Sequence, residues 1–235
     1  MPYKLLNDKK TFANINSENP TVCFLHGWGR SSQDFNLISQ SFNYINFDLP
    51  GFGKSQVPEN SMTPKEHALY INQFIPNSVE TIVGHSYGGR VAVYLSELRK
   101  FEKLILIGVP LIKKQTGYRK FTLLNIYKSL NKLGILSENT LENIKKNKGS
   151  YDYRNSKGIM RDTLVKAVND DLTHKLEHID STVHLIWGSE DKEVQLDIAK
   201  EAYRKIKKST LHILEGKGHN PLNSSYVEIV NIINT

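Results

Sequence analysis

Apolar residues along this chain gather in short, nearly continuous runs rather than alternating strictly with polar residues. Such runs are typical of parallel β-strands that are buried on both faces of a sheet. Most of them end at or near glycine or proline, residues that favour turns. The pattern therefore predicts six strands, at residues 22–26, 44–48, 81–85, 103–109, 183–188 and 210–215.

Segments with helical spacing of apolar residues lie between these runs. Thr63 and Pro64 begin one of them, and Glu66 stands where a capping box requires it. Strands that alternate with helices predict an α/β fold, with a mostly parallel central sheet and helices on both faces. The first 20 or so residues resemble an antiparallel hairpin at the sheet edge. One expected helix begins at Ser31. The others cover residues 63–74, 88–99, 194–206 and 225–233.

Residues 111–176 interrupt the alternation, because they contain no strand signal. They predict two or three amphipathic, lysine-rich helices, at about 118–133, 138–147 and 157–169. We interpret this segment as a helical cap inserted into the core. Residues 1–110 and 177–235 would then form the core, and the cap would lie over one edge of the sheet.

Charge is distributed unevenly between these two parts. The chain has a net charge of +7, but residues 112–166 contain 13 basic and 4 acidic residues, so the remainder is slightly acidic. The basic cap could be a solvated helix face, a docking surface for an acidic acyl carrier protein or an anionic substrate, or a membrane-contacting surface. No stacking aromatic pattern accompanies the lysines, which argues against nucleic acid as a partner.

Length and composition favour an ordinary globular protein of 235 residues, with either one domain and an insertion or two small domains. No apolar run is long enough for a signal peptide or a transmembrane segment, so a cytoplasmic location is expected. The single cysteine, Cys23, lies inside an apolar run and is expected to be a buried core residue without chemistry.

Ser86 stands between Gly84 and Gly88, directly after a predicted strand and before a predicted helix. A bare G-x-S-x-G pattern is weak, but the strand–turn–helix context is that of a nucleophile elbow. The two glycines leave room for the sharp serine turn. Ser86 is therefore the candidate nucleophile.

Three other motifs also follow predicted strands, where an open parallel sheet places its ligand crevice. In His26-Gly27-Trp28-Gly29, glycine lets the loop approach the reacting carbon, so the backbone N–H groups of Trp28 and Tyr87 are candidate oxyanion donors. Asp191 is the candidate acid, with Glu190 and Glu193 as rivals. His219 is the candidate base. The order Ser, Asp, His is the one used by α/β-hydrolases.

Five stretches carry a family resemblance: L-H-G-W-G (25–29), D-L-P-G-F-G-K-S (48–55), G-H-S-Y-G-G (84–89), W-G-S-E-D (187–191) and G-K-G-H (216–219). Together they resemble the α/β-hydrolase superfamily over essentially the whole chain. Within it the chain is similar to small bacterial esterases of the pimeloyl-acyl carrier protein methyl ester esterase type. Many relatives have a proline where this chain has Gln195, which affects a loop and not the triad.

The resemblance implies a Ser–His–Asp triad and no cofactor. It places His26 beside the oxyanion loop, where it would support that loop rather than act as a base. Hydrolysis of carboxylic esters is the leading function. Carbon–carbon bond hydrolysis, lyase or aminopeptidase chemistry on the same triad stay open, as does a non-catalytic receptor. The cap aromatics Tyr118, Phe121 and Tyr127 are expected to line the substrate pocket.

Three weaker signals are given structural interpretations. Gly51 to Ser55 resembles the end of a P-loop, but Asp48 stands where that motif needs its first glycine. His174 and His178 lack the glutamate of a zinc protease helix and are expected to be solvated, so no metal site is predicted. Arg90, one turn after Ser86, is expected to be structural.

Overall fold

The computed structural model describes residues 3–113, 137 and 151–235. The helices expected at 118–133 and 138–147 lie outside the described residues, as do Tyr118, Phe121 and Tyr127. Most of the lysines that make the cap basic also lie there. The proposed pocket aromatics and the docking surface for an acidic partner therefore remain predictions.

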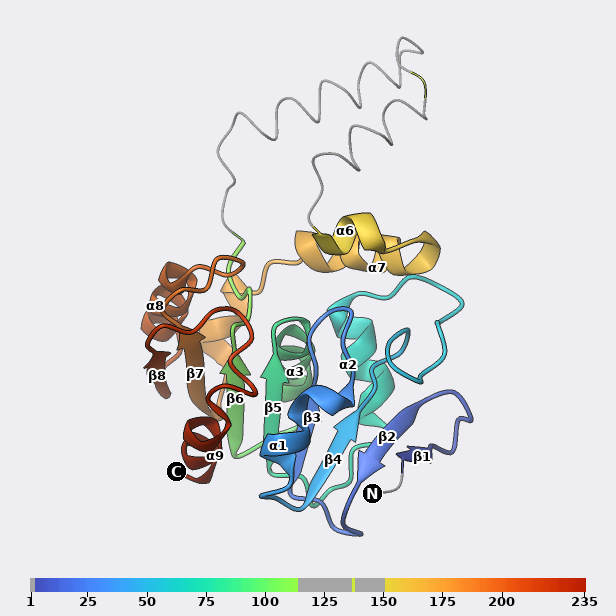
Figure 1. Ribbon diagram of the computed structural model, residues 1–235, viewed down its shortest axis with the longest axis horizontal. Coiled ribbons are helices and arrows are strands. Elements are labelled where there is room, and N and C mark those ends of the chain that lie inside the picture. Colours follow the sequence, from blue (N-terminus) through green and yellow to red (C-terminus); the bar gives the residue numbers. More distant parts are fainter. Residues whose placement is uncertain (1–2, 114–136, 138–150) are drawn as a thin grey trace.

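An eight-stranded sheet forms the centre of the described molecule, in the order β1-β2-β4-β3-β5-β6-β7-β8 (Figure 1). The strands from β3 to β8 pair in parallel, and β1 and β2 form an antiparallel hairpin at one edge. The predicted α/β sheet and its edge hairpin are confirmed. The strands are β1 (Tyr3–Leu5), β2 (Phe12–Ile15), β3 (Val22–Leu25), β4 (Tyr44–Phe47), β5 (Thr81–His85), β6 (Lys103–Ile107), β7 (Thr182–Gly188) and β8 (Ser209–Leu214).

Helices connect the strands near the predicted positions. Thr63 caps one of them, because its hydroxyl accepts from the Glu66 N–H while the Glu66 carboxylate accepts from the Thr63 N–H. The helices are α1 (Asn36–Ser39), α2 (Pro64–Asn72), α3 (Tyr87–Leu98), α6 (Tyr151–Asn155), α7 (Gly158–Asn169), α8 (Leu196–Lys205) and α9 (Tyr226–Asn234), with 3-10 turns η1 (Ser32–Phe35) and η2 (Thr173–His178).

Neighbouring residues of each parallel strand face opposite sides of the sheet, so both sides form apolar cores. In β3, Cys23 packs on the side covered by α2, α3 and α8, whereas Phe24 packs on the side covered by α1 and α9 (Figure 1). Both residues are fully buried. Burial on both faces explains why the inner strands, β3 to β7, form continuous apolar runs in the sequence. It also raises the pKa of the Cys23 thiol, consistent with a core residue.

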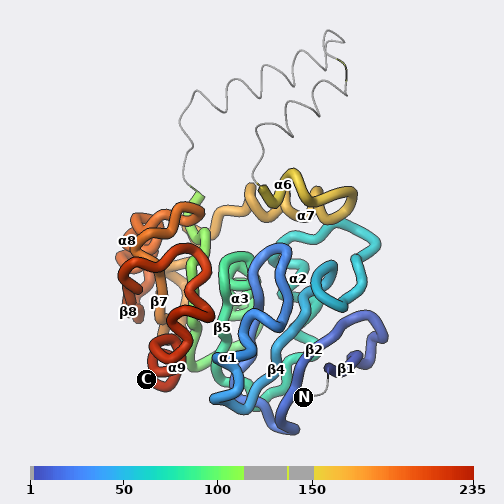
Figure 2. The backbone as a smooth tube through the Cα atoms, in the orientation of Figure 1, coloured from blue at the N-terminus to red at the C-terminus, as the bar shows by residue number. Residues whose placement is uncertain are grey.

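Helices α6 and α7, which belong to the segment predicted to form a cap, lie over the carboxyl ends of the parallel strands, at the end of the molecule opposite β1 and α9 (Figure 2). Hydrogen bonds fix α7 to the core: the Thr163 hydroxyl accepts from the Met62 N–H (3.0 Å), and Lys166 Nζ donates to the Ser61 carbonyl (2.6 Å). The predicted boundary at 176/177 falls inside η2, whose Leu176 is buried in the core. Among the described residues, no helix has the length and apolarity to cross a membrane.

Candidate active site

Ser86 occupies a sharp turn between β5 and α3. Its backbone has φ 49° and ψ −112°, a conformation that non-glycine residues rarely adopt and that recurs at functional sites. The turn closes tightly: a Cβ at Gly88 would lie 2.1 Å from the Leu25 carbonyl oxygen, and one at Gly84 would lie 2.5 Å from the Gly89 Cα. The two glycines therefore let the start of α3 pack directly against the strands.

Ser86, His219 and Asp191 form one continuous hydrogen-bonded chain. His219 Nε2 lies 3.0 Å from Ser86 Oγ, and His219 Nδ1 lies 2.8 Å from Asp191 Oδ2. The three residues come from three different loops at the carboxyl ends of β5, β7 and β8. The carboxylate beside Nδ1 favours the tautomer with a proton on Nδ1, which leaves the Nε2 lone pair free to accept from the serine hydroxyl.

Asp191 is held in place by its own loop. Its second oxygen, Oδ1, accepts hydrogen bonds from the backbone N–H groups of Glu193 (2.9 Å) and Val194 (2.8 Å). The residue is only 6% exposed. The rival Glu190 is exposed, and the Glu193 carboxylate lies 3.7 Å from the other ring nitrogen, Nε2. Only Asp191 thus occupies the position of a carboxylate that orients the imidazole.

The loop after β3 faces the serine turn. His26 is fully buried: its Nε2 accepts from the Leu49 N–H (3.0 Å), so its Nδ1–H donates to the Gly27 carbonyl (2.7 Å). Burial lowers the pKa of His26 and keeps it neutral. In a trans peptide the carbonyl and the N–H point in opposite directions, so holding the Gly27 carbonyl also orients the Trp28 N–H. Tyr87 begins α3, and its N–H has no acceptor within that helix.

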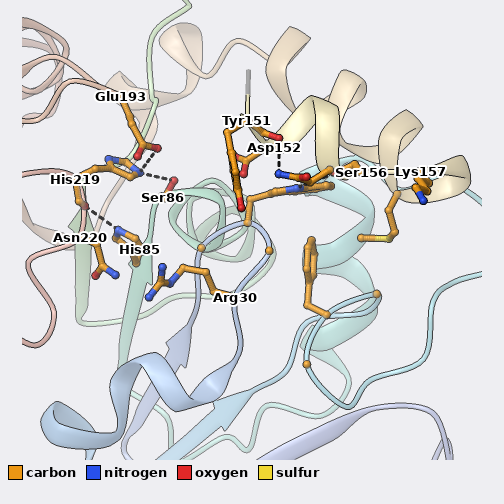
Figure 3. Close-up of a pocket in the computed structure, with 18 residues that line it drawn as sticks. Arg30, His85, Ser86, Tyr151, Asp152, Ser156, Lys157, Glu193, His219 and Asn220 are labelled. Atoms are coloured by element: carbon orange, nitrogen blue, oxygen red, sulfur yellow. Dashed lines mark hydrogen bonds and ion pairs between the residues drawn. The ribbon is translucent and has the colours of Figure 1, made fainter. Parts of the chain in front are cut away.

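A cleft of about 860 Å³ opens above Ser86, between the core loops and the cap helices (Figure 3). Glycines of two loops line it, together with Trp28 and Phe52. The described cap contributes α6 and the start of α7. The lining consists of Gly27, Trp28, Gly29, Arg30, Gly51, Phe52, Gly53, His85, Ser86, Tyr151, Asp152, Asn155, Ser156, Lys157, Met160, Glu193, His219 and Asn220.

Comparison with known proteins now identifies the family. The family model described as "Alpha/beta hydrolase family" matches residues 24–232, a span that includes every candidate residue of the triad and the oxyanion loop. The chain belongs to the α/β-hydrolase family. The predicted superfamily and fold are thereby confirmed.

Proteins similar to this α/β-hydrolase include several that are named as hydrolases. The chain is 25% identical to "Uncharacterized hydrolase YugF" of Bacillus subtilis, over 85% of this chain and 83% of that protein. It is 24% identical to a 2-hydroxy-6-oxononadienedioate/2-hydroxy-6-oxononatrienedioate hydrolase of Cupriavidus pinatubonensis, over 85% and 80%. An esterase structure from Exiguobacterium antarcticum superposes with a TM-score of 0.72 at 20% identity, over 99% and 97% of the two chains. At that identity, the likeness shows the shared fold.

His85 is a site residue of the hydrolase to which the sequence motif assigned no role. Its Nε2–H donates to the His219 carbonyl (3.0 Å), and its ring centroid lies 5.2 Å from that of His219. Burial lowers the pKa of His85 to about 3, so the ring is neutral. It also explains Gly27, because a Cβ there would lie 2.9 Å from His85 Nδ1. Its position next to Ser86 was the only available signal.

Other charged residues reach the cleft from the loops of two motifs and from the segment of α6 and α7. Arg30 pairs with Asp34 four residues later, and Lys157 belongs to the cap. Burial raises the pKa of Asp152, and the nearby Glu193 carboxylate adds to this effect. Arg30 follows β3, Glu193 follows β7, and Asp152 and Lys157 belong to the α6–α7 segment, so only the tertiary structure brings them to one cleft (Figure 3).

Arg90, His174 and His178 lie outside this cleft. Arg90 is buried, and its Nη1 donates to the Asp170 backbone carbonyl (2.8 Å) at the end of α7. His174 and His178 are exposed on η2. Within residues 3–113 and 151–235, no group of three His, Cys, Asp or Glu side chains could hold a metal ion.

Proposed function

We propose that this protein is a serine hydrolase that cleaves carboxylic esters through an acyl-enzyme. The observation that carries the proposal is the hydrogen-bonded chain from Ser86 Oγ through His219 to Asp191, with separations of 3.0 and 2.8 Å. Nucleophile, base and orienting carboxylate at these distances are the arrangement that activates a serine hydroxyl. Membership of the α/β-hydrolase family supports hydrolase activity at these residues.

Acylation begins when Ser86 Oγ attacks the substrate carbonyl carbon and its proton moves to His219 Nε2. Asp191 stabilises the imidazolium that forms. The carbonyl oxygen becomes an oxyanion, which the backbone N–H groups of Trp28 and Tyr87 would hold. When the tetrahedral intermediate collapses, the ester C–O bond breaks and His219 returns the proton to the leaving alcohol.

Deacylation repeats these steps with water. His219 takes a proton from a water molecule, whose oxygen attacks the acyl carbon. The bond to Ser86 then breaks, Ser86 Oγ regains its proton, and the carboxylic acid leaves. The cap would close this chemistry off from solvent, because α6 and α7 form one wall of the cleft.

Carbon–carbon bond hydrolysis is the second candidate, since two kinds of observation favour it. Several relatives at 24–26% identity are named as hydrolases of 2-hydroxy-6-oxo dicarboxylates. Lys157 and Arg30, which also pairs with Asp34, both line the cleft of this chain, where they would attract the carboxylate groups of such a substrate. The same triad would serve both reactions.

A series of p-nitrophenyl esters of increasing acyl length tests the leading proposal. Wild type should release p-nitrophenol, and Ser86→Ala should be at least about a thousandfold slower, because the nucleophile is gone. A fluorophosphonate probe should label the wild type and not the variant.

Wild-type hydrolysis no faster than that of Ser86→Ala for every ester would refute the esterase proposal. Turnover of a 2-hydroxy-6-oxo dienoate by the same preparation would then favour carbon–carbon hydrolysis. Ligand binding without turnover of either substrate would favour a receptor.

A further inference from the structure

The Trp28 side chain connects the oxyanion loop to the cap. Its indole Nε1 donates a hydrogen bond to Ser156 Oγ at 3.3 Å, across 128 residues of sequence. Ser156 lies between α6 and α7, on the cap wall of the cleft (Figure 3). A core residue that is a candidate oxyanion donor is thus in direct contact with the cap.

Ser156 presents this hydroxyl from a fixed backbone. Its N–H donates to the Asp152 carbonyl (2.9 Å), and its carbonyl accepts from Arg161 Nε (2.9 Å). Met160, near the start of α7, packs closely on Gly51: a Cβ atom at Gly51 would lie 2.4 Å from the Met160 sulfur. The hydroxyl therefore has a defined position relative to the core.

The backbone at Trp28 is restrained on its N-terminal side, where His26 Nδ1 (2.7 Å) and the Arg30 N–H (3.3 Å) both donate to the Gly27 carbonyl. Gly27 and Gly29 flank Trp28, Gly29 has φ 67°, and neither contributes a side chain that could anchor the loop. The Trp28 ring packs edge to face on Phe52 and Tyr87, with centroid separations of 4.8 and 5.1 Å. These ring contacts restrict lateral movement of the indole ring, and the hydrogen bond to the Ser156 hydroxyl fixes the position of its Nε1.

We propose that Ser156 is a positioning residue for the oxyanion hole: by holding the Trp28 indole, it acts together with the His26 bond to the Gly27 carbonyl to fix the direction of the Trp28 backbone N–H. This inference rests on the proposed function. Oxyanion donors accelerate a reaction to the extent that they are preorganised before charge develops. Loss of the Ser156 hydroxyl would make the direction of the Trp28 N–H less defined without removing this donor. The loss should therefore weaken stabilisation of the transition state rather than substrate binding.

A double-mutant cycle between Ser156→Ala and Trp28→Phe tests the link. Trp28→Phe keeps the backbone N–H and an aromatic ring but removes the indole donor. Ser156→Ala should lower kcat about three- to tenfold, the range for one neutral hydrogen bond, with KM within about twofold of wild type. In the Trp28→Phe background, Ser156→Ala should have no further effect, because its partner is already gone.

Two more measurements separate positioning from a general loss of structure. Ser156→Thr retains the hydroxyl and should restore most of kcat. A boronic acid inhibitor, which forms a tetrahedral adduct with the serine hydroxyl, should lose affinity in parallel with kcat, whereas the product acid should bind Ser156→Ala as it binds wild type.

Ser78→Ala is the matched control. Ser78 Oγ also donates one hydrogen bond, to the Pro20 carbonyl (2.8 Å), but near the start of β5, away from the cleft. Its kcat should equal that of wild type. Additive effects of Ser156→Ala and Trp28→Phe, or a loss confined to KM, would overturn this inference alone. Absence of ester hydrolysis by the wild type would overturn the proposed function and this inference together.

Discussion

Asp191 and Glu193 stand two residues apart on one loop, yet their carboxylates meet His219 at opposite ring nitrogens. Asp191 Oδ2 lies 2.8 Å from Nδ1, whereas Glu193 Oε2 lies 3.7 Å from Nε2 and the Glu193 side chain is 70% exposed. A carboxylate at Nδ1 can fix the tautomer and stabilise the imidazolium. An exposed carboxylate at Nε2 borders the place where the substrate reacts. Their roles should therefore differ sharply.

At the scale of the residue, we expect Asp191→Asn to lower kcat by about a thousand- to ten-thousandfold. The amide would favour the wrong tautomer of His219, while the Oδ1 bonds to the backbone keep the loop in place. Steady-state kinetics with a p-nitrophenyl ester measures the loss, and a thermal melt checks the fold.

Glu193→Gln is the natural control for this substitution. It removes the rival carboxylate on the same loop and should change kcat less than about tenfold, since exposed charges interact weakly through solvent. Equal losses for the two variants would show that the assignment of the acid to Asp191 is wrong.

At the scale of the element, α3 links the nucleophile to the cap. It begins directly after Ser86, and its Arg90 and Tyr94 both hold Asp170 at the end of α7: Arg90 Nη1 donates to the Asp170 carbonyl (2.8 Å) and Tyr94 Oη donates to Oδ1 (2.8 Å). Arg90 Nη1 also lies 3.7 Å from Oδ2 of the Asp170 carboxylate. One helix thus positions both the serine and one end of the cap.

We expect Arg90→Leu to loosen α7. The substitution leaves the Asp170 carbonyl without its donor, and hydrogen bonds to charged groups contribute about 1.5–3 kcal/mol. Amide hydrogen exchange in Gly158–Asn169 should accelerate at least about tenfold relative to exchange in α8.

Arg99→Leu provides the comparison from the other end of α3. Arg99 also donates to backbone carbonyls, those of Ile75 (3.0 Å) and Pro76 (3.1 Å), which belong to the core segment between α2 and β5. Its loss should leave exchange in α7 unchanged. If both variants accelerate α7 equally, Arg90 acts through global stability and not as a local anchor.

At the scale of the whole molecule, histidines make stability sensitive to acid. Burial lowers the pKa of five of them below the ordinary value: His26, His67, His85, His184 and His212. His184 Nδ1 and His212 Nε2 also lie 3.0 Å apart on neighbouring strands, so a charge on one would disfavour a charge on the other. The native protein therefore binds fewer protons than the unfolded chain in mildly acidic solution.

The sign of the pH dependence follows from this difference. Below about pH 6.5 the histidines of the unfolded chain become protonated, whereas the buried histidines of the native protein stay neutral. His85 stays neutral until the pH approaches its pKa of about 3. The histidines' contribution to the free energy of unfolding should therefore be complete above pH 7. The free energy of unfolding should fall as the pH is lowered from about 6.5. Urea unfolding at pH 7.5 and pH 5.0 measures the change.

Replacing both His184 and His212 by glutamine should reduce the slope of stability against pH, because two of the depressed groups are removed. Equal unfolding free energies of the wild type at the two pH values would contradict the prediction. So would a slope that the double substitution leaves unchanged.

Much of the architecture could be predicted from the chain because its signals are local. Buried parallel strands leave continuous apolar runs, Thr63 and Glu66 mark a helix start, and Ser86 between Gly84 and Gly88 marks a strained turn. The expected helix over 157–169 also matches α7 closely. Short elements were missed: α6 has only five residues, too few for a helical period to emerge.

The sequence by itself determined the family, the order of strands and helices, and the candidate residues Ser86, Asp191 and His219, because each lies in a local pattern that a backbone conformation demands. Only the tertiary structure decided which neighbour of Asp191 faces which nitrogen, that His85 supports the His219 loop, and that Ser156 meets Trp28. Those contacts join loops far apart in the chain. They depend on where strands end and how the cap packs, which no local pattern specifies.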